Sequence, residues 1–451
     1  TVAPYWLDAL PPRDAYPPLT SNSNADLCIV GGGFTGLWAA LHAKKADPWR
    51  DVVVLEQETI GYGASGRNGG FVLSSLTHGI NNGLSRFENE MPELERLAAE
   101  NFAGMKEDIQ THGIDCDFEE TGDLLAILEP YQDEWVEEET ELMRRFGHEV
   151  ETLDREQVRA EVNSPLYRAG IWDKTGAAIV DPGKLADGLR EAAIRQGVRI
   201  YEQTPVQELH EAEAVVEVRT PNGKIKANKV LLATSAYPPL LKEMKRYLAP
   251  VYDYALMTEP LTEQQQNDIG WRNRQGVGDG ANQFHYYRLT TDNRILWGGY
   301  DAVYRFGSPV KPKLDDHDKS FAMLSQHFFT NFPQLEGIRF THRWGGAIDT
   351  CSRFAVFFGT AHAGKTAYAV GYTGLGVAST RFGAKTALQI LDGQAPAMAY
   401  IQKKPVPFPP EPLKYAVIQL TRNRLQAADE NEGRRGLWLK TLDRLGLGFD
   451  S

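Results

Sequence analysis

Short apolar runs that end at glycine or at an acidic residue predict the buried strands of a parallel sheet. In residues 26–30 the apolar run begins at Leu27 and stops before Gly31. Residues 52–55 are three valines and a leucine. Between them, residues 36–46 have the composition of a helix. A strand, a helix and a strand in this order predict a βαβ unit with its two strands parallel.

The same alternation of strand and helix returns further along the chain. It predicts a helix that begins near Pro182, a hairpin that turns at residues 221–223, and a final helix that ends at Leu391. In full, these predicted elements are a helix at 184–195, strands at 198–201, 215–219, 224–227, 230–233 and 366–370, and a helix after the glycine-rich turn 371–376.

Between these segments the pattern changes. Residues 91–150 contain long charged helical stretches, such as 132–146. Residues 245–335 contain aromatic strands, at 285–289 and 294–300. The two kinds of segment interleave, which predicts two domains that are each discontinuous in sequence.

The bulk composition narrows the class of protein. The chain has 451 residues, 42% of them hydrophobic and 24% charged, which predicts a soluble protein with more than one core and excludes a disordered or fibrous one. The net charge of -12 argues against nucleic acid as a partner, because phosphates need a basic surface. An acidic field would attract a cationic substrate, although most acidic proteins owe such a charge to their solvated surface.

The cysteines and the N-terminus indicate the compartment. Cys28, Cys116 and Cys351 are far apart, without the spacing of a metal site, so we expect no metal and a reducing environment. Residues 1–24 are rich in proline and predict an extended arm, without the apolar run of a signal peptide. No stretch is apolar for long enough to span a bilayer. We therefore predict a cytoplasmic protein that binds no membrane.

Residues 31–36 match the pattern G-x-G-x-x-G in the context that gives this pattern its meaning. The motif follows a predicted strand and opens a predicted helix, and Glu56 ends the next strand about twenty positions on. The first glycine permits the tight turn, the second lets the backbone approach a pyrophosphate, and the third lets helix and strand pack closely. Glu56 would accept hydrogen bonds from the adenosine ribose, which disfavours NADP. The motif does not distinguish FAD from NAD.

A second loop of small residues, 63–70, follows soon after Glu56. A dinucleotide with a ribityl chain needs backbone donors beyond its pyrophosphate, and this loop would supply them, with Ser65 and Arg67 as polar contacts. The alternative is a loop whose glycines serve only to turn the chain.

Taken together, these motifs resemble the D-amino-acid oxidase and glycine oxidase superfamily of FAD enzymes, and within it the gamma-glutamylputrescine oxidase-like branch. GGGFTGLWAAL at 31–41, the acidic Glu56 and GASGRNGG at 63–70 carry the resemblance, and GYTGLGV at 371–377 extends it. Further segments fall in family order, so that the resemblance covers most of residues 1–400.

The resemblance implies a fold class: α/β, with a Rossmann-type FAD-binding domain interleaved with an antiparallel-sheet substrate domain. We expect residues 1–90, 150–240 and 336–400 in the FAD-binding domain, and 91–149 and 241–335 in the substrate domain. Residues 401–451 are proline-rich, then charged and helical. This C-terminal tail would pack either on the body of the protein or on a second subunit.

The resemblance also implies residues at the cofactor. Val206 would meet the adenine through its backbone, and the turn 371–376 would lie at the flavin pyrimidine, with outward-pointing amides that stabilise the charge of the reduced ring. Some relatives attach the flavin through a cysteine near the C-terminal flavin segment. Residues 343–347 contain none, so we expect noncovalent FAD. The cofactor-binding residues expected are Gly31, Gly33, Phe34, Thr35, Gly36, Glu56, Gly63, Ala64, Ser65, Arg67, Asn68, Gly69, Gly70, Val206, Thr234, Gly345, Gly346, Gly371, Thr373, Gly374, Leu375 and Gly376.

The residues expected at the substrate are Tyr252, Tyr287, Arg288 and Trp344. In the wider family a tyrosine and an arginine often bind the substrate carboxylate, and Arg288 would do so with two hydrogen bonds. The alternative is that the alternating aromatic residues line the core of a sheet and that Arg288 forms a surface ion pair.

The expected reaction is hydride transfer from the carbon that bears an amine to flavin N5, followed by imine hydrolysis and reoxidation by O2 with release of H2O2. Two alternatives remain: a dehydrogenase that uses another electron acceptor, and an FAD-bound assembly factor without turnover. The substrate is equally open, among polyamine conjugates, N-alkyl amino acids, simple amino acids and aminophosphonates.

Overall fold

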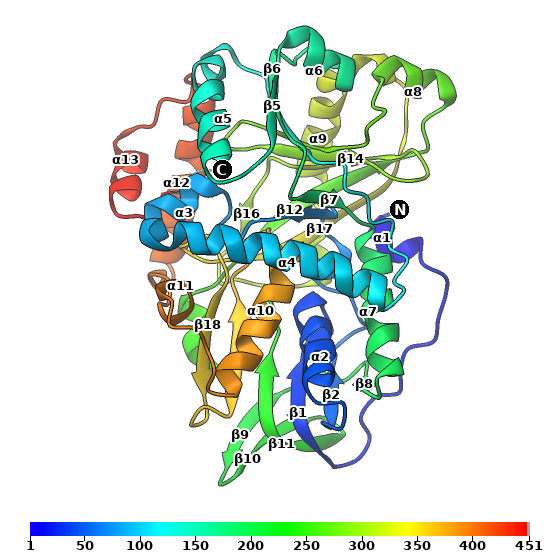
Figure 1. The fold of residues 1–451 in the computed structure, drawn as a ribbon, viewed down its shortest axis with the longest axis vertical. Coiled ribbons are helices and arrows are strands. Elements are labelled where there is room, and N and C mark those ends of the chain that lie inside the picture. Colours follow the sequence, from blue (N-terminus) through cyan, green and yellow to red (C-terminus); the bar gives the residue numbers. More distant parts are fainter. Residues whose placement is uncertain (449–451) are drawn as a thin grey trace.

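The structure is a computed structural model that describes residues 1–448, and it is built on two large β-sheets (Figure 1). The first sheet has the strand order β18-β19-β11-β1-β2-β8, with the hairpin β9–β10 attached to β11. β1 pairs in parallel with both β11 and β2, as the predicted βαβ unit requires. The strands of this sheet are β1 Ser23–Val30, β2 Val52–Leu55, β8 Arg199–Tyr201, β9 Glu208–Ala212, β10 Val215–Thr220, β11 Gly223–Leu232, β18 Phe357–Ala361 and β19 Thr366–Val370.

The central strand β1 is buried on both faces, which explains its continuous apolar run. Leu27 and Ile29 belong to the core beneath the helices, whereas Cys28 and Val30 pack in a second cluster with the β10–β11 hairpin. Helices α2, α7 and α10 lie in front of this sheet in Figure 1, and α2 contacts both α7 and α10. These helices are α2 Phe34–Ala46, α7 Pro182–Arg195 and α10 Gly376–Leu391.

The second sheet has nine strands in the order β16-β12-β15-β14-β13-β4-β6-β5, with β17 paired along β12. All neighbours are antiparallel except β13 and β4. Its strands are β4 Asp123–Ile127, β5 Val150–Leu153, β6 Ala169–Asp173, β12 Ala249–Thr258, β13 Gly276–Asp279, β14 His285–Leu289, β15 Ile295–Gly299, β16 Val303–Tyr304 and β17 Phe340–Thr350. A separate pair, β3 Phe71–Leu73 and β7 Ala177–Ile179, completes the strands.

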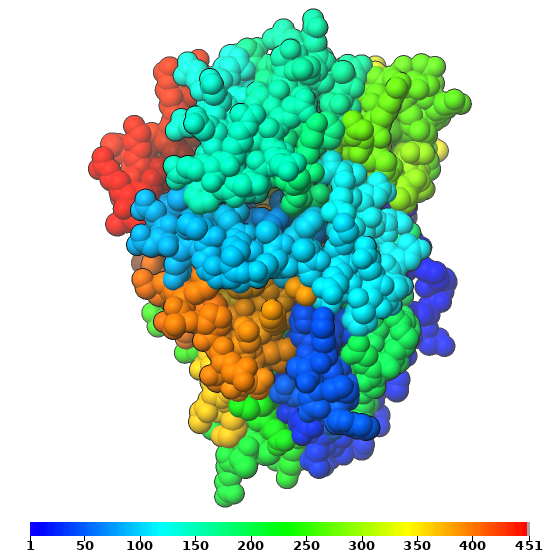
Figure 2. Space-filling model, in the orientation of Figure 1, coloured from blue at the N-terminus to red at the C-terminus, as the bar shows by residue number. Residues whose placement is uncertain are grey.

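The long helix α4 (Met91–Thr111) crosses the junction between the two halves, and in the space-filling view it forms a band across the middle of that face (Figures 1 and 2). None of the helices in residues 1–448 is long and apolar enough to cross a membrane. The other α-helices are α1 Tyr5–Asp8, α3 Ile80–Phe87, α5 Val136–Arg145, α6 Arg155–Glu161, α8 Glu263–Ile269, α9 Asp318–Asn331, α11 Ala399–Gln402, α12 Leu413–Asp429 and α13 Leu437–Arg444. Short 3-10 helices lie at η1 Ala64–Gly66, η2 Glu88–Glu90, η3 Pro130–Trp135, η4 Lys242–Arg246, η5 Pro312–Leu314 and η6 Pro333–Leu335.

The α/β fold with two interleaved sheets is confirmed, and three details differ from expectation. The stretch 132–146 is divided between η3 and α5, with Pro130 at the start of η3. The strands expected at 224–227 and 230–233 are one strand, β11, which pairs with β10 at its start and with β1 along its length. The N-terminal arm contains the helix α1, because burial of Trp6 anchors it.

Strand pairing groups some segments differently from the expected domain ranges. β5 and β6 fall within residues 150–240, and β17 falls within 336–400, yet all three belong to the nine-stranded sheet. β6 pairs with β4, and β17 pairs with β12 over ten residues from Ala249 to Thr258. The tail packs on the body of the same chain, where the carboxylate of Asp429 accepts hydrogen bonds from the backbone of Asn282 and Gln283 at 2.9 Å each.

His148 links strand β6 of the second sheet to helix α4, and this contact depends on pH. Its Nδ1 lies 2.7 Å from Asp173 on β6, and its Nε2 lies 3.4 Å from Glu95 on α4. These hydrogen bonds raise the pKa of His148 from 6.5 to about 9. A raised histidine pKa contributes stability that is complete below pH 6.5 and lost as the pH rises through 9.

We therefore expect His148→Gln to flatten the pH dependence of the unfolding free energy. Between pH 6.5 and 9 the wild type should lose ~1–2 kcal/mol more than the variant, a value reduced for partial exposure of the pair. Urea titrations of both proteins across this range measure the difference. Parallel pH profiles for the two proteins would show that the contact contributes nothing.

Candidate active site

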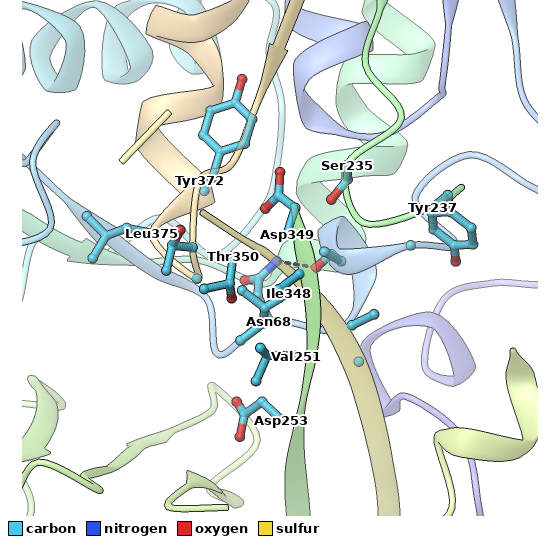
Figure 3. Close-up of a pocket in the computed structure, with 18 of the residues that line it drawn as sticks. Asn68, Ser235, Tyr237, Val251, Asp253, Ile348, Asp349, Thr350, Tyr372 and Leu375 are labelled. Carbon is cyan, nitrogen blue, oxygen red and sulfur yellow. Dashed lines mark hydrogen bonds between the residues drawn. The ribbon is translucent and has the colours of Figure 1, made fainter. Parts of the chain in front are cut away.

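One large cavity, of about 1050 Å³, lies between the two sheets. The carboxyl ends of β1, β2 and β11 form one part of its wall, and the face of the second sheet forms another. Figure 3 shows Asn68 in the middle of this wall, with Asp349 and Tyr372 on one side and Asp253 on the other. Ligands of open α/β sheets bind outside the carboxyl ends of the strands, so the cavity has the expected location for a dinucleotide.

The glycine-rich turn lies at the mouth of the first sheet, where β1 ends and α2 begins. Gly31 has φ +112°, and a Cβ there would lie 2.3 Å from the carbonyl oxygen of Ala233. A Cβ at Gly36 would lie 1.9 Å from the carbonyl oxygen of Gly31. Only glycine fits these two positions, so the turn brings the N-terminus of α2, whose first amides have no partner within the helix, to the cavity.

Glu56 is held at the carboxyl end of β2 beside this turn. Its Oε2 accepts a hydrogen bond from the backbone of Gly32 at 2.7 Å, and its Oε1 accepts one from the backbone of Glu58 at 2.9 Å. Burial raises the pKa of Glu56, and these two backbone donors oppose the rise. The carboxylate is thus fixed at the wall of the cavity. Each of its oxygens can accept a further hydrogen bond, for example from a ribose hydroxyl.

The loop 63–70 lies between the two sheets. Ser65 Oγ accepts a hydrogen bond from the backbone of Phe34 at 2.8 Å, which places this hydroxyl at the first turn of α2. Arg67 donates to Asp315 at 2.7 Å and to the carbonyl of Gly345 at 3.0 Å. The loop therefore reaches the nucleotide turn at one end and β17 at the other, as a cofactor that spans both sheets requires.

The turn before α10 is organised by a buried carboxylate that the sequence did not indicate. Asp349 Oδ2 accepts a hydrogen bond from the backbone of Gly371 at 2.6 Å. Burial still raises the pKa of Asp349 to about 6. The amide of Gly371 thus binds Asp349 and does not point outward as expected, whereas the later residues of the turn, from Thr373 to Gly376, lie on the cavity wall.

Strand alternation decides which residues of the second sheet face the cavity. Gly298 on β15 pairs with Ala255 on β12 and with Tyr286 on β14, and directly paired residues lie on the same face. Asp253, two positions from Ala255, shares this face and lines the cavity. The cavity floor is therefore formed by Asp253, Ala255, Tyr286 and, from β17, Trp344.

Two of the four residues expected at the substrate occupy the opposite face. The Tyr287 hydroxyl lies 2.5 Å from that of Tyr167, and the Tyr252 hydroxyl accepts a hydrogen bond from the backbone of Lys311 at 3.1 Å. Both rings are fully buried in the core beneath the sheet. Strand alternation thus turns both side chains away from the cavity, so that they cannot touch a substrate there.

Arg288 shares the face of Tyr286 but is covered by other residues. Its guanidinium donates to the carbonyls of Gly70 and Val180 and lies 5.4 Å from the ring of Trp6. Burial lowers the pKa of Arg288 to about 10. Arg288 anchors the N-terminal arm and does not reach the cavity, so neither the carboxylate role nor the surface ion pair fits this arrangement. Trp344 lines the cavity and donates to the carbonyl of Arg67 at 2.9 Å.

Most residues expected at the cofactor are brought together on the cavity wall. Gly36, Gly70, Gly345 and Gly371 instead lie behind it, where a Cβ would meet neighbouring backbone at Gly36 and Gly70 and an aromatic ring at Gly345 and Gly371. Those on the wall are Gly31, Gly33, Phe34, Thr35, Glu56, Gly63, Ala64, Ser65, Arg67, Asn68, Gly69, Val206, Thr234, Gly346, Thr373, Gly374, Leu375 and Gly376.

The wall also includes residues that the sequence did not single out. Asp253 is the only acidic residue in the aromatic strand 249–258, and that contrast was the available signal. Ile418 and Arg422 show that helix α12 of the tail contributes to the wall. All three cysteines are buried and lie off the cavity wall; Cys351 Sγ contacts the carbonyl of Ala355 at 3.2 Å.

Comparison with known proteins agrees with this geometry. Residues 26–389 match the DAO family, described as FAD dependent oxidoreductase. The chain is 33% identical to the gamma-glutamylputrescine oxidoreductase of Escherichia coli, over 87% of this chain and 89% of that protein. It is 30% identical to the probable oxidoreductase OrdL of Haemophilus influenzae, over 90% and 92%.

Solved structures with the same fold include glycine oxidase from Geobacillus kaustophilus and L-proline dehydrogenase from P. horikoshii. The glycine oxidase has a TM-score of 0.68 and 18% identity, and the match covers 85% of this chain and 99% of that one. The dehydrogenase has a TM-score of 0.67 and 19% identity, and the match covers 84% and 96%. At these identities the likeness is one of fold.

Proposed function

The chain belongs to the DAO family of FAD-dependent oxidoreductases, and from this premise we propose that it oxidises the carbon–nitrogen bond of a small amine or amino acid with O2 as the final acceptor. One observation carries the proposal: a single cavity is lined both by the glycine-rich turn at Gly31 and by Tyr286 on the second sheet. A dinucleotide with its adenosine at the first sheet would bring its redox ring to the second.

The nucleotide end of the cavity has the donors that FAD needs. The N-terminus of α2 would hold the pyrophosphate, Glu56 the ribose, and the loop 63–69 the ribityl chain. When bound, FAD would supply the hydride acceptor, and O2 would be the final electron acceptor, reduced to H2O2. The absence of a cysteine from the described wall supports noncovalent binding.

The face of the second sheet would bind the substrate beside that ring. The amine must be neutral when it loses hydride, because its lone pair assists the transfer. Tyr286 and Trp344 provide an apolar wall that desolvates the amine and lowers its pKa. The imine product takes up water and yields a carbonyl compound and ammonia or a smaller amine.

The relatives and the composition support further parts of the proposal. The Escherichia coli relative is named for gamma-glutamylputrescine, which makes amine conjugates a substrate class to test first.

Three free, buried cysteines suit a reducing compartment, and we place the protein in the cytoplasm. We propose a small-molecule substrate and O2 as its partners.

Anaerobic mixing of the purified yellow protein with a panel of amines and amino acids tests this function. A substrate is expected to bleach the flavin absorbance, and air is expected to restore it with one H2O2 for each substrate oxidised. Acid precipitation should release the flavin into the supernatant. If air restored the flavin absorbance only slowly and a quinone restored it rapidly, the protein would be a dehydrogenase. A flavin that no member of the panel bleaches would overturn the proposal.

A further inference from the structure

Asp123 on β4 differs from the other carboxylates of the cavity wall, because one of its buried oxygens has no hydrogen-bond donor. Within residues 1–448 its Oδ1 is without any partner. Asp253 shows the usual arrangement: its Oδ2 accepts a hydrogen bond from the Tyr286 hydroxyl at 2.6 Å, and its Oδ1 accepts one from the backbone of Tyr254 at 2.8 Å. A buried carboxylate oxygen without a donor is costly, so at a cavity it indicates a ligand or a proton that completes it.

Strand register places Asp123 on the same face of the second sheet as Tyr286. Asp123 pairs with Gly276 on β13, and Gly278, two positions further along β13, pairs with Tyr286 on β14. Directly paired residues share a face of the sheet, and so do residues two positions apart, so all four lie on the cavity side. Because the two β13 residues on this face are glycines, no side chain of that strand separates the carboxylate from the Tyr286 ring.

The space above these two glycines is apolar and partly open. A Cβ at Gly276 would lie 2.3 Å from the Phe71 ring and 3.2 Å from Asp123 Oδ1, so the ring and the carboxylate meet above this glycine. A Cβ at Gly278 would have a single atom within 4 Å, the carbonyl oxygen of His285 at 3.8 Å. Phe71 also packs edge-on against Tyr286, with ring centroids 5.9 Å apart. The carboxylate therefore borders an apolar space that extends to Tyr286.

These surroundings make Asp123 a stronger base than an exposed aspartate. Burial, and then repulsion from its cross-strand partner Asp173 on β6, raise the pKa of Asp123 to about 7. Asp173 itself lies 2.7 Å from His148 Nδ1. His78, the histidine of the described wall, is a weaker base, because burial lowers its pKa to about 4. The burial that raises the pKa of a carboxyl group lowers that of an amine, so the two values approach each other, which favours proton transfer between them.

We propose that Asp123 is the proton acceptor of the reaction: a substrate that arrives as an ammonium ion gives its proton to Asp123 and is then the neutral amine that loses hydride. The N–H bond breaks and leaves its electron pair on nitrogen, while the proton forms a bond to Asp123 Oδ1. The proton returns to water when the product leaves. This inference rests on the proposed function and adds the step that the apolar wall of Tyr286 and Trp344 leaves open, which is where the proton goes.

The pH dependence of flavin reduction tests the inference. The limiting rate constant is measured in anaerobic stopped flow, with the member of the panel that bleaches the flavin fastest. In the wild-type holoenzyme it should fall as the pH drops through about 7, because Asp123 must be ionised to accept the proton. Asp123→Asn should lose this pH dependence and be about 100-fold slower at pH 8, whereas Asp123→Glu should retain it.

Asp115→Asn is the control, because Asp115 is exposed and does not line the cavity, and it should match the wild type. A pH profile of Asp123→Asn that parallels that of the wild type, at any rate, would overturn the inference and leave the proposed function intact. A wild-type flavin that no member of the panel bleaches would overturn both.

Counting protons on binding separates a catalytic role of Asp123 from a structural one. The probe has methyl groups in place of the hydrogens on the reacting carbon and cannot lose hydride: tert-butylamine for a simple amine, 2-aminoisobutyrate for an amino acid. Each holoenzyme is titrated with it at pH 8 in weak buffer with phenol red. The wild type should release no proton, because the proton passes to Asp123, and Asp123→Asn should release about one for each probe bound. Release of one proton by both proteins would show that desolvation alone neutralises the amine, and release by neither would show that the amine stays charged. Either result would overturn the assignment of Asp123.

Discussion

Gly33→Asp is expected to give a folded but colourless protein. Gly33 is the N-cap of α2, and its extended backbone, with φ −85° and ψ −172°, accepts an aspartate. The new carboxylate would bind the first amides of α2, which the pyrophosphate needs. A Cβ at this position lies 2.8 Å from Ser65 Oγ, so that hydroxyl must move as well. At an effective dielectric constant of 20, two like charges 4 Å apart repel by about 4 kcal/mol, which is roughly a 1,000-fold loss of FAD affinity.

The chain provides a matched control in Gly436. This glycine is the N-cap of α13, with φ −72° and ψ 174°, and no atom lies within 4 Å of a Cβ added there. Gly436→Asp therefore makes the same change in the same backbone conformation, at a residue that does not line the cavity, and should purify yellow. Flavin content, measured by absorbance after release, and the far-UV circular dichroism of each variant decide the result. A Gly33→Asp protein as yellow as wild type would refute the assignment of this turn to the phosphates.

The nucleotide half could be predicted because its determinants are local in sequence. The requirement for glycine at position 36 arises within one turn, because a Cβ there would meet the carbonyl oxygen of Gly31, and the requirement at position 31 arises from its own φ of +112°. The apolar run of β1 likewise reports burial on both faces without knowledge of its neighbours. Local signals of this kind predict both the strand and helix of the βαβ unit and the turn that joins them.

The residues of the substrate half could not be predicted in the same way. Whether a side chain of the second sheet faces the cavity or the core changes with a shift of one position along the strand. Tyr286 and Tyr287 are adjacent and chemically alike, yet one faces the cavity and the other the core. Arg288 is withdrawn from the cavity by Trp6, which lies 282 positions earlier in the chain. No local pattern contains that contact, so the choice of Tyr252, Tyr287 and Arg288 rested on residue type and on the family resemblance.

Asp349→Asn is expected to loosen the turn before α10 and to release FAD. The carboxylate accepts a hydrogen bond from the amide of Gly371, and an asparagine that presents its NH2 group there turns a donor toward a donor. Each buried amide left unpaired costs about 1–3 kcal/mol. Thr373 in this turn has a strained backbone, with φ +54°, so the turn depends on this anchor. We expect a 10- to 100-fold loss of FAD affinity, since about 1.4 kcal/mol corresponds to tenfold.

The pH dependence of FAD release gives this prediction a signature that general destabilisation lacks. Burial raises the pKa of Asp349 to about 6, so below that pH the wild-type side chain is protonated and resembles the asparagine. The wild type should therefore lose FAD faster as the pH falls from 8 through 6, and the variant should show a smaller change. Asp154→Asn serves as the matched control, because Asp154 also accepts hydrogen bonds from backbone amides, at the exposed N-cap of α6, where asparagine caps equally well. Flavin fluorescence after dilution measures release in all three proteins. Similar pH profiles for the wild type and Asp349→Asn would mean that the charge of Asp349 does not hold the turn against the cofactor.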